Sequence, residues 1–124
     1  MPAAIEIRHL TKDYGNLRAV DDLSFTAAAG EIIALLGPNG AGKSTLMNMI
    51  TGYLAPSSGD IFILGRNIRD NPLSAKASVG FLPEGAPLYP DLSVRDFLRY
   101  MAELRGLPAA RIAEAAETAN VTQV

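Results

Sequence analysis

The sequence predicts an α/β fold with an antiparallel β part at the N-terminus, a glycine-rich loop in its middle and a helical segment at the C-terminus. Three observations support this prediction. Apolar and polar residues alternate around residues 5–10 and 19–25, as expected for two strands. The apolar run 31–36, which predicts a buried strand, leads directly into the glycine-rich loop 37–45. From Ser93 onward, apolar residues recur at helical spacing.

The two N-terminal strands are expected to pair antiparallel, because Tyr14, Gly15 and Asn16 predict a turn between them. Two further apolar runs, 60–65 and 79–82, predict short strands. The segment 83–90 contains three prolines and is therefore expected to be a loop. The only histidine, His9, has no partners that could complete a metal site, and no function is assigned to it.

Four helices are expected. One spans 44–51 and stops at Gly52, and a brief one opens at 71–73. A third begins at the capping residue Ser93 and ends at Gly106, and a fourth runs over 108–119. The third helix carries an apolar stripe that predicts a core or partner-facing surface: Val94, Phe97, Leu98, Met101 and Leu104.

The glycine-rich loop has the pattern G-x-x-x-x-G-K-[ST], which is typical of a phosphate-binding loop. Glycines allow positive φ angles, so that successive backbone N–H groups can surround an anion, and the following helix points its N-terminus at the phosphates. Lys43 is expected to bind the β and γ phosphates, and the hydroxyl of Ser44 to bind Mg²⁺. The residues of the loop are Gly37, Pro38, Asn39, Gly40, Ala41, Gly42, Lys43, Ser44 and Thr45. They predict a P-loop NTPase fold.

Composition narrows the classes of function. The 124 residues carry 11 Lys and Arg against 13 Asp and Glu, a net charge of −2, and the basic residues are scattered, which argues against a nucleic-acid partner. There is no cysteine, so disulfides and thiolate metal sites are excluded. The N-terminus lacks the features of a signal peptide, and no run approaches the roughly 18 apolar residues of a membrane span. The chain is therefore expected to be neither secreted nor membrane-spanning.

Several segments, taken in order, resemble the ATP-binding cassette family. They are residues 12–15, 19–25, 30–32, the loop 37–45, residues 51–59 and residues 80–84. The resemblance implies an ATP-binding subunit of an ABC transporter, with ATP and Mg²⁺ as cofactors. Residues 82–84, 87–90 and 94–98 look similar to the ABC-2 and gliding-motility type exporters. The family resemblance also implies that residues 1–124 are the N-terminal part of one ATP-binding domain, with residues 1–90 as its β-rich and P-loop core and 91–124 as the start of its helical subdomain.

The resemblance also assigns roles to residues outside the loop. Tyr14 would stack on adenine, with Val20 packed nearby; the alternative is that Tyr14 is a strand-end residue packed on the sheet. Glu84 stands where the family usually has a glutamine that reaches Mg²⁺ and the attacking water. A glutamate can also bind Mg²⁺, so Glu84 and Lys43 are the candidate catalytic residues, with Ser44 and Glu84 as metal ligands. The alternative is that Glu84 is a solvated loop acid.

Three later elements of the family do not follow Glu84 in this sequence: a second apolar strand that ends in Asp-Glu, a signature loop and a switch histidine. The chain therefore looks like the N-terminal part of an ATPase, and alone is expected not to hydrolyse ATP. The expected partners are ATP, transmembrane permease subunits and a second nucleotide-binding subunit. These would place it in the cytoplasm at the inner face of the membrane. The alternative function is a nucleotide-binding module without hydrolysis, or a soluble ABC protein outside transport.

Overall fold

A computed structural model describes residues 3–38, 40, 42–83, 85 and 88–122. The chain forms two compact units, Met1–Phe81 and Leu82–Val124, which are treated separately below. The first unit holds the sheet and the phosphate-binding loop, and the second holds the C-terminal helices. All candidate site residues that the structure describes lie in the first unit.

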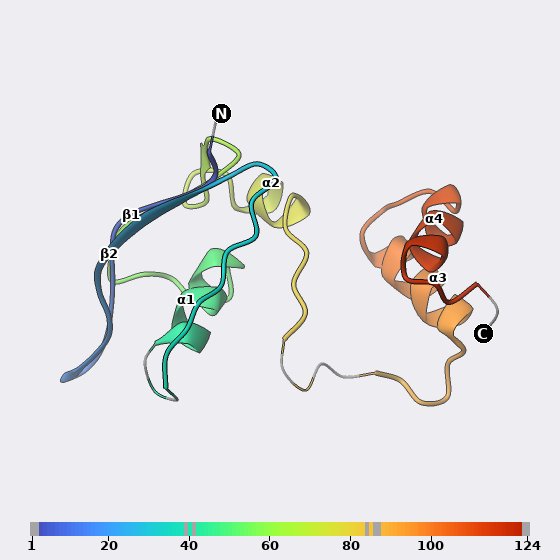
Figure 1. The fold of residues 1–124 in the computed structure, drawn as a ribbon, viewed down its shortest axis with the longest axis horizontal. Helices are drawn as coiled ribbons and strands as arrows, with labels where there is room; N and C mark the ends of the chain where they lie inside the picture. Colours follow the sequence, from blue (N-terminus) through green and yellow to red (C-terminus); the bar gives the residue numbers. More distant parts are fainter. Residues whose placement is uncertain (1–2, 39, 41, 84, 86–87, 123–124) are drawn as a thin grey trace. The chain divides into compact units, whose positions relative to one another are not determined.

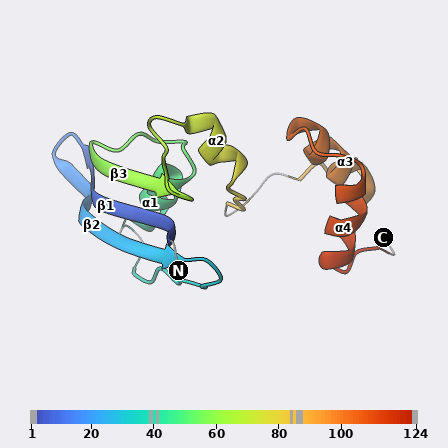
Figure 2. The ribbon, with the colours of Figure 1, turned by 90° about the horizontal axis from the view of Figure 1, so that it is seen from above.

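The first unit is built on a four-stranded antiparallel sheet (Figures 1 and 2). Its strands are β1 (Ala3–Tyr14), β2 (Leu17–Ala28), β3 (Ser58–Ile63) and β4 (Arg66–Asn67), in the spatial order β2-β1-β3-β4. The predicted hairpin of two N-terminal strands is confirmed, and both strands are longer than the alternating pattern indicated. The strand predicted at 60–65 is also confirmed, as β3, and a two-residue turn connects it to β4.

Four register shifts interrupt the pairing of β1 with β2, and His9 and Asp22 lie at two successive ones. Ile7 pairs with Phe25 and Leu10 with Leu23, so β1 has one extra residue between these pairs. His9 sits at this irregularity with φ 49°, and Asp22 on β2 has φ 48°. The His9 Nδ1 and Asp22 Oδ1 atoms lie 2.8 Å apart. Such bulges turn residues at non-alternating spacing toward one face, which buries both Ile7 and Leu10.

The core of the first unit lies between the sheet and two helices. Helix α1 (Lys43–Ile50) lies against one face of the sheet, and the short helix α2 (Pro72–Ala77) lies near β4 (Figures 1 and 2). Four core side chains are almost fully enclosed: Ile7, Leu10, Met49 and Ile61. Both helices were predicted, and α1 ends as expected, with Thr51 as its C-cap and Gly52 at φ 85°. This packing fixes the orientation of α1 and therefore of the loop before it.

The prediction of a buried strand at 31–36 is wrong. The segment has no regular structure, and Ile32 and Leu36 are 99% and 90% exposed. Residues 79–82, predicted as another strand, are also irregular. A strand needs a neighbour to pair its N–H and C=O groups. The described sheet of β1 to β4 does not extend to either segment, so their apolar sequence alone does not produce strands.

The second unit contains α3 (Val94–Leu104) and α4 (Ala110–Thr118). The predicted cap of α3 is confirmed, because the Ser93 hydroxyl accepts a hydrogen bond from the backbone N–H of Asp96 at 3.1 Å. Helix α4 begins two residues later than predicted. The rings of Tyr89 and Tyr100 meet edge to face, with centroids 5.9 Å apart. The apolar stripe of α3 stays partly exposed, and Leu104 is 63% exposed.

Candidate nucleotide-binding site

Two described glycines of the phosphate-binding loop have left-handed backbone conformations. Gly40 and Gly42 have φ angles of 87° and 91°, which residues with a Cβ rarely adopt. Gly42 is also the N-cap of α1, and no side chain caps this end of the helix. As in any α-helix, the first N–H groups of α1 have no acceptor within the helix, and here no capping side chain replaces it. They and the helix dipole make this end of α1 favourable for an anion.

Side chains at the start of α1 add charge and hydroxyl groups to this site. The ammonium of Lys43 folds back over the loop and donates a hydrogen bond to the carbonyl oxygen of Gly37. Lys43 and Thr45 are half-buried, whereas Ser44 is exposed. One cation, two hydroxyls and a row of backbone N–H groups thus converge on one end of α1. This set of donors matches the needs of a polyphosphate.

Close packing on β2 holds the loop in place. A Cβ atom at Gly42 would clash with the backbone carbonyl of Ala19 and would lie 3.4 Å from a methyl group of Val20. At Gly40, by contrast, a Cβ would meet nothing within 4 Å. The glycine at position 42 therefore serves two purposes, a positive φ angle and the close approach of the loop to β2. This contact ties the phosphate-binding loop to the hairpin that carries Tyr14.

Tyr14 and the phosphate-binding loop line one pocket. Its volume is about 310 Å³, and its walls come from the tip of the β1–β2 hairpin and from the start of α1. The lining residues are Tyr14, Leu17, Arg18, Ala19, Gly40, Gly42, Lys43, Ser44 and Thr45. The Tyr14 side chain is 47% exposed and is not among the core residues, so part of its ring is free to meet a ligand. The structure thus brings together residues that lie far apart in the sequence.

Val20 does not line the pocket of Tyr14, although its sequence neighbour Ala19 does. It is 7% exposed, belongs to the core, and lines an adjacent pocket with Lys43. Ala19, which the sequence analysis did not single out, lines the pocket of Tyr14 instead. Leu17 and Arg18 were also missed. The register Tyr14↔Leu17 at the end of the hairpin places them there, and only the pairing of the strands shows this.

Charges at the hairpin tip are largely paired. The guanidinium of Arg18 donates to Asp13 at 2.8 Å and to Asp21 at 3.3 Å. The hydrogen bond that Arg18 donates to Asp13, together with the negative charge of Asp13, raises the pKa of Arg18 above its ordinary value. The Arg18 guanidinium therefore keeps its positive charge at every physiological pH and loses this charge only in strong alkali. Lys43 has no carboxylate partner among the ion pairs of the described residues.

Part of the predicted site lies outside the described residues, namely Asn39, Ala41 and Glu84. Pro38 is described and exposed, immediately before Asn39. Within the described part of the chain, no group of three or more His, Cys, Asp or Glu side chains could hold a metal ion. A Mg²⁺ site here would rest on the Ser44 hydroxyl together with nucleotide phosphates and water. That arrangement suits Mg²⁺, which commonly takes few protein ligands beside phosphates.

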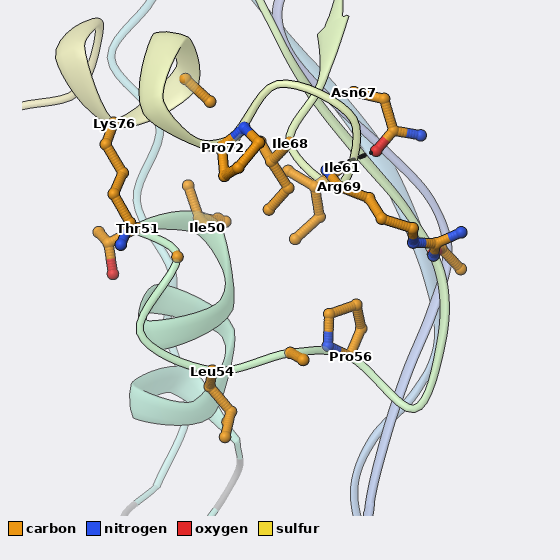
Figure 3. A pocket seen from close by; sticks show the side chains of 14 residues that line it. Ile50, Thr51, Leu54, Pro56, Ile61, Asn67, Ile68, Arg69, Pro72 and Lys76 are labelled. Carbon is orange, nitrogen blue, oxygen red and sulfur yellow. Dashed lines mark hydrogen bonds between the residues drawn. The ribbon is translucent and has the colours of Figure 1, made fainter.

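A different pocket lies at the other end of α1. Its volume is about 300 Å³, and it is enclosed by the last turn of α1, by β3 and β4, and by α2 (Figure 3). Ile50, Leu54, Ile61 and Ile68 give it a mainly apolar lining, with Arg69 at its edge. None of the candidate site residues lines it. Arg69 and Lys76 also line it, but it has neither the glycine-rich loop nor the N-terminal end of α1, so the site at the start of α1 is the candidate for nucleotide binding.

The fold and the site define a nucleotide-binding protein of the P-loop class. A phosphate-binding loop precedes a helix packed on a sheet, and an aromatic side chain lines the same pocket. Comparison with known families agrees with this class: the family described as ABC transporter matches residues 20–124. The chain belongs to the ABC transporter family, and its fold is an incomplete form of the ABC ATPase fold.

Curated relatives are considerably longer than this chain. One is a probable multidrug ABC transporter ATP-binding protein, YbhF, of Escherichia coli (strain K12), with 40% identity over 103 residues. That match covers 83% of this chain and 18% of the relative. Another is the Nod factor export ATP-binding protein I of Paraburkholderia xenovorans, with 43% identity, covering 88% of this chain and 36% of the relative. The chain thus corresponds to a minor part of each relative.

Solved structures show the same fold. A structure of an ATP-binding subunit of an ABC transporter matches with a TM-score of 0.76 and 34% identity, over 86% of this chain and 45% of that one. The structure of cbiO1 from Clostridium perfringens, part of an ABC transporter complex, matches with a TM-score of 0.75 and 27% identity. That match covers 94% of this chain and 49% of that one. Among the described residues, no helix is long and apolar enough to cross a membrane.

Proposed function

We propose that this chain is the ATP-binding part of an ABC exporter's ATPase subunit, and that it binds ATP with Mg²⁺ in the pocket between Tyr14 and the phosphate-binding loop. The observation that carries the proposal is that Tyr14 and residues 42–45 line one pocket of about 310 Å³. An aromatic ring at one end suits a purine, and a cation at a helix N-terminus suits phosphates. The two ends of the site thus match the two ends of ATP.

Within the site, each group has a distinct task. Lys43 exchanges its hydrogen bond with the carbonyl of Gly37 for the β and γ phosphates, to which it brings a full positive charge. The first N–H groups of α1 and the glycine backbone bind the remaining phosphate oxygens. Ser44 holds Mg²⁺, which offsets the phosphate charge. Glu84 is proposed as a second ligand of the metal and, with Lys43, as a catalytic residue of the longer protein.

Transport is proposed from the family and from its relatives. The relatives' names include multidrug transport and Nod factor export, which supports an exporter. We infer that the longer protein pairs with transmembrane permease subunits and with a second nucleotide-binding subunit. This assembly would place the chain in the cytoplasm at the inner face of the membrane. ATP binding and hydrolysis by the longer protein would then drive export.

The binding proposal is tested by changing Lys43 to Ala and measuring ATP affinity by calorimetry in the presence of Mg²⁺. A charge-assisted hydrogen bond is worth about 1.5–3 kcal/mol, so we expect the affinity to fall by roughly ten- to a hundredfold. Lys76→Ala is the matched control, because it removes the same charge from α2, which does not line the pocket. Equal ATP affinity in the native chain and Lys43→Ala would contradict the proposal.

A further inference from the structure

We propose that Lys12 is a positioning residue that holds the ring of Tyr14 in place for stacking on the nucleotide base. The inference rests on the proposed function, in which Tyr14 is the residue that meets the base. Lys12 does not line the pocket. Its effect is therefore exerted through Tyr14 and through the loop that follows α1.

The ammonium of Lys12 makes two contacts at once. It lies over the Tyr14 ring, 5.3 Å from the ring centroid, and it donates a hydrogen bond of 2.9 Å to the carbonyl oxygen of Ala55. A cation at this distance is attracted to the electron-rich face of an aromatic ring. Because Lys12 is half-buried and fixed at Ala55, it supports one face of the ring. The other face remains for a base.

The second contact connects the hairpin to α1. Ala55 belongs to the loop that leaves the C-terminal end of α1 and crosses toward the sheet, the loop that carries Leu54 and Pro56 in Figure 3. The phosphate-binding loop lies at the opposite end of the same helix. Lys12 therefore joins the ring proposed to bind the base to the loop that follows the helix proposed to bind the phosphates.

Two backbone contacts strengthen the same connection. The N–H of Asp13 donates to the Ser57 hydroxyl at 2.9 Å, and the N–H of Ser57 donates to the carbonyl oxygen of Thr11 at 2.9 Å. The end of β1 is thus fastened to residues 55–57 by three hydrogen bonds, of which Lys12 makes one. A ring that is already in position loses less freedom when the nucleotide binds. Removal of Lys12 should therefore weaken the recognition of the base and leave phosphate binding unchanged.

The test compares two ligands, ATP and inorganic tripolyphosphate, each with Mg²⁺, in calorimetry on the full chain. For Lys12→Met we expect the Kd for ATP to rise about three- to tenfold, because only part of the energy of one cation–π contact and one hydrogen bond is expressed in base binding. The Kd for tripolyphosphate should stay within about twofold, because that ligand has no base. Lys12→Arg keeps a cation and donors, and it should restore most of the ATP affinity.

Two further variants separate the possible outcomes. Ser57→Ala removes another of the three contacts without changing any charge, and it should raise the Kd for ATP in the same direction as Lys12→Met. It also keeps the inference testable if Lys12→Met does not fold. Tyr14→Ala reports on the stacking itself, and it should raise the Kd for ATP alone.

Each contrary result has its own meaning. If Tyr14→Ala weakens ATP binding but Lys12→Met and Ser57→Ala do not, the role of Lys12 is overturned and the proposed function stands. If Lys12→Met weakens both ligands equally, the effect is one of charge or folding, and the positioning role is overturned. If Tyr14→Ala changes neither ligand, the stacking part of the proposed function fails, and the role of Lys12 fails with it.

Discussion

Gly42 is the residue at which sequence, conformation and packing are most tightly linked. It has a positive φ angle of 91°, begins α1, and lies against the Ala19 carbonyl so closely that no Cβ would fit. Gly40, two residues earlier, has a similar φ of 87° but open space around it. The two glycines share a positive φ angle, but only Gly42 contacts β2 and only Gly42 begins α1. This difference allows the contact to be tested.

We expect Gly42→Ala to destabilise the chain more than Gly40→Ala. A left-handed conformation costs an L-residue about 1–2 kcal/mol at either position. At Gly42 the clash with a backbone atom adds about 1–3 kcal/mol, because a backbone carbonyl cannot move aside as a flexible side chain can. Urea unfolding of the two variants measures the difference in the free energy of unfolding. Equal destabilisation would show that the contact between Gly42 and Ala19 carries no energy.

The segment 31–36 is the element whose sequence and structure differ most. Its residues are apolar on both sides, as in a strand buried in a parallel sheet, yet it is irregular and Ile32 is 99% exposed. Among the hydrogen bonds between described residues, the backbone of this segment takes part in one outside regular elements, from the Glu31 N–H to the Ala28 carbonyl oxygen. An extended apolar segment with free N–H and C=O groups favours association with other chains.

We therefore expect the native chain to self-associate, and the double variant Ile32→Lys, Leu36→Lys to do so less. Both side chains are at least 90% exposed, so the substitutions should cost little stability. Leu73→Lys is the matched control, because Leu73 is 83% exposed but lies on α2. Light scattering over a concentration series gives the mass of the particles. A native chain that stays monomeric throughout would contradict this expectation.

The sequence was most informative where local rules determine the structure. The glycines of the loop, the helix that follows it and the Ser93 cap could all be predicted, because each depends on residues close together in the chain. The bulges at His9 and Asp22 could not, since they arise from the pairing of two strands. For the same reason, the sequence did not point to Ala19, which lines the pocket of Tyr14. Segments 31–36 and 79–82 show that an apolar pattern needs a neighbouring strand.

For the molecule as a whole, ATP binding and ATP hydrolysis depend on different groups. The described residues supply Lys43, Ser44 and the uncapped start of α1, to which the proposed function assigns binding. Hydrolysis also needs groups that orient the attacking water and stabilise the charge of the transferring phosphoryl group. This chain covers 36% of its Nod factor export relative, so most of that protein's residues have no counterpart here.

We accordingly expect the chain alone to bind ATP without turning it over. Phosphate release from ATP and Mg²⁺ should equal that of Lys43→Ala, which serves as the background. The assay is informative only at concentrations where binding has been demonstrated. A rate clearly above this background in the native chain, and lost in Lys43→Ala, would show that the residues present are sufficient for hydrolysis.

We propose that one pocket holds ATP with its base at Tyr14 and its phosphates at the start of α1. An ATP analogue with a photoreactive azide on the adenine ring tests this most directly, because the label marks the residues that surround the base. After illumination and digestion with trypsin, which cleaves after Lys12 and Arg18, the label should be found on the peptide 13–18. Excess ATP and the variant Lys43→Ala should both suppress it. Labelling at residues 66–76 or 94–118 instead, or labelling that persists in Lys43→Ala, would contradict the claim.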